Sequence, residues 1–108
     1  MNDQEFRDRA DGALKDLEKA LLRAGDSHGF ETDNNQGALT VEFEDPPAKF
    51  VVSPNFPVRQ IWVSARVRSF KLDWDEPGGE FVLAADRRTL KQLLADLASE
   101  QLGEPVAL

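Results

Sequence analysis

The stretch Ala38-Leu39-Thr40-Val41-Glu42-Phe43-Glu44 decides the fold. Its apolar side chains alternate with polar ones, which predicts a strand with one dry face and one wet face. Before this stretch the apolar residues recur every three or four positions, and after it the period stays near two as far as residue 84. The chain therefore changes from helix to sheet close to residue 38.

Four further strands are predicted downstream, because short apolar runs are separated by turn-forming proline, glycine, asparagine and aspartate residues. The connections are too short for crossovers, so neighbouring strands should pair antiparallel. A short strand upstream, over residues 30–33, would bring the sheet from five strands to six. The four downstream strands are expected at residues 49–53, 59–65, 69–74 and 80–84.

A helix is predicted at each end of the chain, over residues 3–24 and 87–102. We expect Asp3 and Asp86 as their N-caps, with Gly25 and Gly103 ending them. Terminal helices cannot serve as crossovers inside a parallel sheet. The predicted fold class is therefore α+β, a two-layer sandwich of an antiparallel sheet of five to six strands with both helices on one face. The length of 108 residues predicts a single domain over 1–108.

Charge is distributed unevenly along the chain, whose formal net charge is −7. Residues 1–45 hold 12 acidic and 5 basic residues, whereas the remainder is balanced. An acidic surface repels nucleic acid, so no nucleic-acid partner is expected. No stretch approaches the roughly 20 apolar residues of a membrane span. The polar N-terminal segment and the absence of cysteine favour a cytoplasmic protein.

The residues that could support catalysis are few. The chain has no cysteine and one histidine, His28, which lies in a polar segment and is expected to be solvated. No motif places a serine beside it, and no spacing typical of an enclosed zinc or di-iron site occurs. We therefore expect a protein that is not an enzyme. The alternative hypothesis, in which the protein is an enzyme, is a ferroxidase-like activity on bound Fe(II).

Carboxylates offer a second kind of chemistry. Asp11 and Glu18 are seven residues apart, so they share one face of the first helix, and Glu31 and Asp33 follow in the next segment. Exposed oxygen ligands spread in this way suit weak binding of hard cations such as Fe(III), Ca²⁺ or Mn²⁺. Ordinary solvated acids with some pairing along the helix remain the alternative.

Trp62 is the most distinctive residue of the predicted sheet. In Gln60-Ile61-Trp62-Val63-Ser64 the aliphatic residues should face the helices, which turns Trp62 outward among polar neighbours, including Lys71 of the next strand. An aromatic ring set in a polar sheet face is typical of a binding anchor. A register slip by one residue would instead bury Trp62. Nearby bases predict a positively charged patch beside it, formed by Arg59, Arg66, Arg68 and Lys71.

Several segments along the chain together form a pattern that is most specific around Trp62. They are Met1-Asn2-Asp3-Gln4-Glu5-Phe6 with Ala10-Asp11, Gly37-Ala38-Leu39-Thr40-Val41, Gln60-Ile61-Trp62-Val63-Ser64 after Pro57, Leu72-Asp73-Trp74, Thr89-Leu90 with Leu93-Leu94, and Gly103-Glu104. In these segments, nearly from end to end, the chain resembles the frataxin family, especially its short bacterial CyaY-type members.

This resemblance implies a non-enzymatic, iron-binding regulator of iron–sulfur cluster assembly that contacts a cysteine desulfurase and its scaffold protein. Iron (Fe²⁺ or Fe³⁺) would bind weakly at surface carboxylates, and the protein would be a monomer, with iron-dependent oligomers as an alternative. The acidic positions that match are Asp3, Asp11, Glu18, Glu31 and Asp33. The partner-binding positions that match are Asn55, Gln60 and Trp62, and Lys71 is added to them because it is expected beside Trp62 on the outer sheet face.

One departure from the family concerns the end of the first helix. Bacterial members carry a dense acidic run there, whereas this chain reads Lys19-Ala20-Leu21-Leu22-Arg23-Ala24-Gly25. We therefore expect iron binding to be weaker or relocated. The alternative function is a protein-interaction module of the same fold that has lost most of its iron binding.

Overall fold

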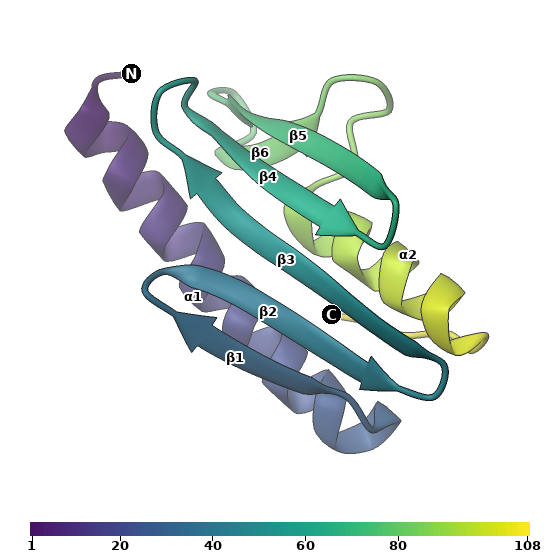
Figure 1. The fold of residues 1–108 in the computed structure, drawn as a ribbon. Helices are drawn as coiled ribbons and strands as arrows, with labels where there is room; N and C mark the ends of the chain where they lie inside the picture. The colour runs from purple at the N-terminus through teal and green to yellow at the C-terminus, as the bar shows by residue number, and fades with distance from the viewer.

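The computed structural model describes all 108 residues and consists of two helices and a six-stranded sheet (Figure 1). The strands follow one another in the order β1 to β6, and every neighbouring pair is antiparallel. Both helices lie on the same side of the sheet, which confirms the predicted α+β sandwich. The elements are α1 (Asp3–His28), β1 (Glu31–Asn35), β2 (Ala38–Glu44), β3 (Pro47–Asn55), β4 (Gln60–Ala65), β5 (Arg68–Asp75), β6 (Glu80–Leu83) and α2 (Leu90–Leu102).

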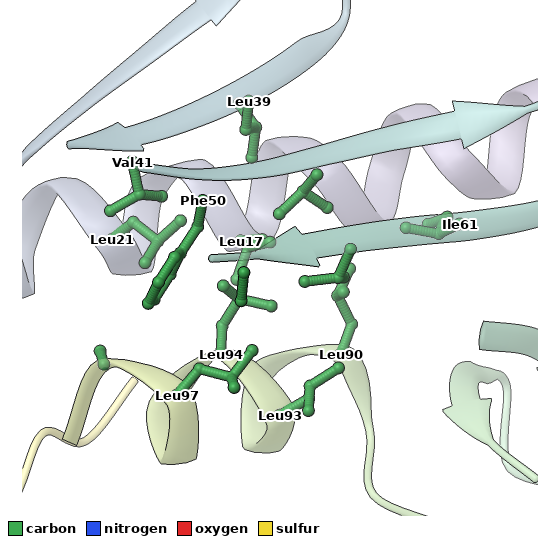
Figure 2. Packing of buried hydrophobic residues seen from close by; sticks show 14 of the residues in the cluster. Leu17, Leu21, Leu39, Val41, Phe50, Ile61, Leu90, Leu93, Leu94 and Leu97 are labelled. Carbon is green, nitrogen blue, oxygen red and sulfur yellow. The ribbon is translucent and has the colours of Figure 1, made fainter. Parts of the chain in front are cut away.

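The hydrophobic core lies between the sheet and the two helices. Figure 2 shows Leu17 and Leu21 of α1, Phe50 of β3, and Leu94 and Leu97 of α2 gathered in this layer. Full burial of one such side chain stabilises the fold by about 1.5–3 kcal/mol. The strand residues in the core come from alternate positions, as the period of two predicts: they are Leu39, Val41, Phe43, Phe50, Val52, Ile61, Val63, Ala65, Leu72, Phe81 and Leu83.

Helix α1 is longer than predicted, and its caps are different residues. Its N-cap is Asn2, whose side chain accepts a hydrogen bond from the backbone N–H of Glu5. It ends at Gly29, which has φ +79° in the left-handed region that glycine adopts easily. The predicted stop at Gly25 was wrong, because this residue lies buried inside the helix. Glycine is required there since a Cβ atom would collide with the backbone carbonyl oxygen of Phe30.

Helix α2 begins three residues later than predicted. Thr89 is its N-cap and forms a capping box with Gln92, in which each side chain accepts a hydrogen bond from the other's backbone N–H. Asp86, the predicted N-cap, instead accepts hydrogen bonds from the backbone and side chain of Arg88. The intervening Arg87 has φ +66°, which is incompatible with a continuous helix from that point.

Strand β3 extends through a segment that the sequence predicts as a loop. Pro54 pairs with Ile61, and Asn55 pairs with Gln60. On its other side β3 pairs with β2 only as far as Val52, opposite Leu39. Proline is tolerated at position 54 because no ladder hydrogen bond to β2 is lost there. The extension places Asn55 on the sheet, directly across from Gln60.

One ion pair joins the middle of α1 to the start of α2. The Lys91 ammonium of α2 lies 2.7 Å from Asp16 Oδ2 of α1. The hydrogen bond from Lys91 is the largest cause that lowers the pKa of Asp16 below its ordinary value. Neither helix combines the length and the apolar character that a membrane span requires.

The two glycines inside α1 predict opposite responses to the same substitution. Gly12→Ala should raise the free energy of unfolding by about 0.5–1 kcal/mol, because its Cβ meets no neighbour and alanine favours helix. Gly25→Ala should lower it by about 1–3 kcal/mol, because the Phe30 backbone must move. Urea unfolding followed by circular dichroism measures both values. Equal effects of the two substitutions would contradict this account of α1.

The Asp16 carboxyl offers a test of the contact between the helices. In Lys91→Gln the pKa of Asp16 should rise toward the ordinary aspartate value, because the hydrogen bond that lowers it is lost. In the native protein, the Asp16–Lys91 pair stabilises the fold at pH values above the ordinary aspartate pKa. This stabilisation is lost as the pH falls through the lowered pKa of Asp16. Carboxyl ¹³C NMR titration measures this, with Lys49→Gln on β3 as control. An Asp16 titration that is identical in native protein and Lys91→Gln would show that the pair is absent in solution.

Candidate functional site

The outer face of the sheet, which the helices leave uncovered, carries the predicted partner-binding residues. Trp62 lies opposite Ser53 of β3 on one side and opposite Lys71 of β5 on the other. In the next row along the strands, Gln60 lies between Asn55 and Asp73. Because residues paired or two apart on a strand share one face, Asn55, Gln60, Trp62 and Lys71 come together. We call these four residues with Asp73 the Trp62 cluster.

The Trp62 indole is held in place by hydrogen bonds. Its Nε1–H donates to Gln60 Oε1 over 2.9 Å, and Gln60 Nε2 donates to Asp73 Oδ1 over 3.0 Å. The Lys71 ammonium lies 4.8 Å from the centroid of the indole ring, within the range of a cation–π interaction. Trp62 is 37% exposed, so the predicted outward orientation is confirmed and the slipped register is wrong. The ring offers an apolar surface to a partner while its own polar atom is satisfied.

A shallow hollow of about 390 Å³ lies beside the ring on this face. Val51 of β3, which is half-buried, contributes an apolar patch, and the hydroxyl groups of Ser53, Ser64 and Ser69 surround it. A hollow next to an exposed tryptophan suits an inserted side chain from a partner protein, because central contacts that exclude water dominate such interfaces.

The positively charged patch predicted beside Trp62 does not form as predicted, because two of its four bases, Arg59 and Arg68, pair with acids of the helices. Arg59 binds Asp3 of α1 at 2.7 Å, and Arg68 binds Glu100 of α2 at 2.9 Å, so both side chains reach toward the helices. Arg68, Phe70 and Leu72 occupy alternate positions of β5, so Arg68 points to the same side of the sheet as the buried Leu72, which is the helix side. The charges of the Trp62 cluster are instead one cation, Lys71, and one anion, Asp73.

Asp73 is the member of this cluster that sequence reasoning missed. Its position two residues after Lys71 in the alternating strand places it on the same outer face. The alternation could therefore have identified it. Its role is to accept the hydrogen bond that orients the Gln60 amide, which in turn orients Trp62.

The five predicted metal-ligating acids are divided between two surfaces. Asp11 and Glu18 lie on α1, about 10 Å apart along its axis by the helical rise, so one ion cannot bind both. Glu31 and Asp33 lie on the outer face of edge strand β1, opposite Glu42 and Thr40, respectively.

Several of these acids already have partners within the protein. Asp3 pairs with Arg59, and Glu18 accepts a hydrogen bond from Asn34. No group of three or more histidine, cysteine, aspartate or glutamate side chains is close enough to hold a metal ion. The donors are hard carboxylate oxygens of the kind that iron accepts, but each presents its charge singly or beside one neighbour.

The remaining candidate, His28, lies at the end of α1 rather than in a solvated loop. Its Nδ1 atom is 2.6 Å from Glu104 Oε2, in the segment after α2. Its side chain is 21% exposed and pairs with Glu104, so the expectation of a solvated loop residue was wrong. The contact joins the C-terminal segment to α1, which is a structural role.

Comparison with known proteins agrees with this architecture. A family model described as a frataxin-like domain matches residues 1–104. The protein named "Iron-sulfur cluster assembly protein CyaY" of Pseudomonas paraeruginosa is 35% identical over 108 residues, covering 98% of this chain and 95% of that protein. Its namesake of Dechloromonas aromatica is 34% identical and covers 100% and 99%, respectively.

A solved structure shows the same fold. Frataxin from Psychromonas ingrahamii superposes with a TM-score of 0.84 over 99% of this chain and 97% of its own, at 24% sequence identity. A structural likeness at 24% identity shows the fold alone, whereas the family model and the curated relatives show the family. This chain belongs to the frataxin family.

Proposed function

We propose that this protein is an accessory regulator of iron–sulfur cluster assembly that acts by docking partner proteins on the Trp62 cluster. The observation that carries the proposal is an exposed tryptophan, oriented by Gln60 and Asp73, at the centre of an uncovered sheet face. The names of the relatives, which describe cluster assembly, support the pathway. We propose a single cytoplasmic domain over residues 1–108 that is monomeric and has no catalytic centre.

The geometry of the Trp62 cluster suits recognition of another protein. A tryptophan has few rotatable bonds, and the hydrogen bond to Gln60 restrains the indole further, so little conformational freedom is lost on binding. The hollow beside the ring could receive a partner side chain. Lys71 and Asp73 present opposite charges around the ring, which can align a partner and discriminate between competitors.

We propose a cysteine desulfurase and the iron–sulfur scaffold protein as the partners on this face. Iron would be carried as cargo, bound weakly at Asp3, Asp11, Glu18, Glu31 and Asp33. Single exposed carboxylates that retain water on a bound ion give low affinity and rapid release. Such binding would suit transfer of the ion better than storage.

The alternative function, an interaction module with little iron binding, is favoured by a specific observation. The candidate ligands are divided between α1 and the outer face of β1, and no group of three assembles. The second half of α1 also carries Lys19 and Arg23, whose charges oppose cation binding. Protein docking does not depend on the metal in this alternative.

Truncation of the tryptophan tests the docking surface. We expect Trp62→Ala to weaken binding to the desulfurase or the scaffold by about 2 kcal/mol, roughly thirtyfold in Kd, because a central aromatic anchor is lost. Isothermal titration calorimetry with each purified partner measures this. Leu22→Ala is the matched control, since Leu22 is 48% exposed on α1, away from the sheet. Equal affinities of the native protein and Trp62→Ala for both partners would disprove the anchor role.

Titration with Fe²⁺ and Fe³⁺ separates the two functions. If iron is cargo, amide signals near Asp11 and Glu18, or near Glu31 and Asp33, should broaden locally in ¹⁵N NMR spectra. The variant Asp11→Asn/Glu18→Asn should abolish the effect on α1 and leave β1 unchanged. Absence of localised broadening at either surface would favour the module without iron. Oxygen consumption measured with Fe(II) would reveal the ferroxidase alternative.

A further inference from the structure

A second concave site lies on the helix side of the sheet, away from the Trp62 cluster. It is a cleft of about 400 Å³ between the first half of α1, the β5–β6 hairpin and the start of α2. This volume falls within the range of small-molecule sites. Two of its lining residues, Gly12 and Gly79, lack side chains, and a Cβ at either position would meet no atom within 4 Å. The cleft is therefore open partly because glycine occupies a position in the middle of α1.

Some of the charged side chains that line the cleft have partners within the protein and others do not. Lys91 and Asp16 form an ion pair with each other at 2.7 Å, and Asp8 accepts a hydrogen bond from the Gln4 amide at 2.9 Å. Arg9 and Glu80 also line the cleft, yet neither forms an ion pair within the protein. One unpaired cation and one unpaired anion thus face the same space.

The inner wall of the cleft is apolar and contains an unsatisfied donor. Ala13, Phe81 and Leu90 line it together with Trp74. The Arg9 guanidinium lies 5.2 Å from the centroid of the Trp74 ring. The indole Nε1–H of Trp74 is buried and has no hydrogen-bond acceptor in the protein. Buried polar groups are rarely left without a partner, so the Trp74 N–H is a donor that still lacks an acceptor.

We propose that this cleft binds a small α-amino acid in its zwitterionic form. The ligand carboxylate would contact Arg9, whose planar guanidinium matches carboxylate geometry and lies over the Trp74 ring. The ligand ammonium would contact Glu80, and an apolar side chain would pack against Phe81 and Leu90. A simple anion would leave Glu80 unmatched, and a simple cation would leave Arg9 unmatched, so charge complementarity selects a zwitterion.

The test uses the complete protein and the indole NMR signal of Trp74, identified by its persistence in Trp62→Phe. Three probes are titrated separately: leucine, 4-methylpentanoate, which lacks the amino group, and 3-methylbutylamine, which lacks the carboxylate. Leucine should shift the Trp74 indole signal in a saturable way, and each analogue should bind at least about tenfold more weakly. No saturable shift with leucine, or equal binding of leucine and either analogue, would overturn the proposal.

Variants separate binding from folding. Arg9→Gln should weaken leucine binding about tenfold or more, and Glu80→Gln should remove the preference for leucine over 4-methylpentanoate. Gly12→Leu should abolish binding by filling the cleft while the thermal midpoint is maintained, because position 12 is open and leucine favours helix. Lys19→Gln, on an exposed part of α1 outside the cleft, is the control and should bind as the native protein does. Unchanged leucine binding in both Arg9→Gln and Gly12→Leu would overturn the assignment of this cleft.

Discussion

The register of the central strands is the constraint on which the rest of the structure depends. Ile61 and Val63 of β4 face the helices and are almost fully buried. A shift of one residue would exchange the two faces, burying Gln60 and Trp62 and exposing the aliphatic residues. Because several neighbouring strands repeat the same alternation, each pairing enforces the register of the next. The exposed tryptophan is therefore a consequence of the pattern that builds the core.

The two helices cover one face only, and this asymmetry creates two different surfaces. On the outer face, the strands alone bring Gln60, Trp62 and Asp73 together, so the hydrogen bonds of the cluster depend on sheet register. On the helix side, the cleft depends on how α1, α2 and the β5–β6 hairpin pack, with Lys91 and Asp16 joining the helices. Both surfaces are hollowed to a similar volume, and they differ in their residues: the first presents an exposed tryptophan ring on a sheet face, and the second presents Arg9 and Glu80 in a cleft between elements.

The interrupted acidic character of α1 has a structural counterpart. The acids of α1 and those of β1 follow closely in the sequence but lie on different sides of the sheet. Glu31 and Asp33 occupy outward-facing positions of β1, whereas Asn34 occupies an inward-facing position and donates a hydrogen bond to Glu18 of α1. Neighbouring basic residues pair with some of the acids, as Arg59 does with Asp3. An iron site with several carboxylate ligands would require the acids of α1 and those of β1 to lie on the same side of the sheet. Within the proposed function, this arrangement gives protein docking more weight than iron binding.

The sequence by itself determined the fold class and the order of the elements, because periods of two and near 3.6 report local geometry directly. It predicted the outward orientation of Trp62, and the structure excluded the slipped register. It also contained the signal for Asp73, two residues from Lys71. It could not determine where α1 ends, because Gly25 is required by the backbone of Phe30 rather than by a turn. The tertiary structure alone decided that Arg59 and Arg68 reach the helices, that the acids are divided, and that Arg9 and Glu80 face one cleft. The physical reason is that these features join residues far apart in the chain, whose separation depends on packing between elements and not on periodicity within one.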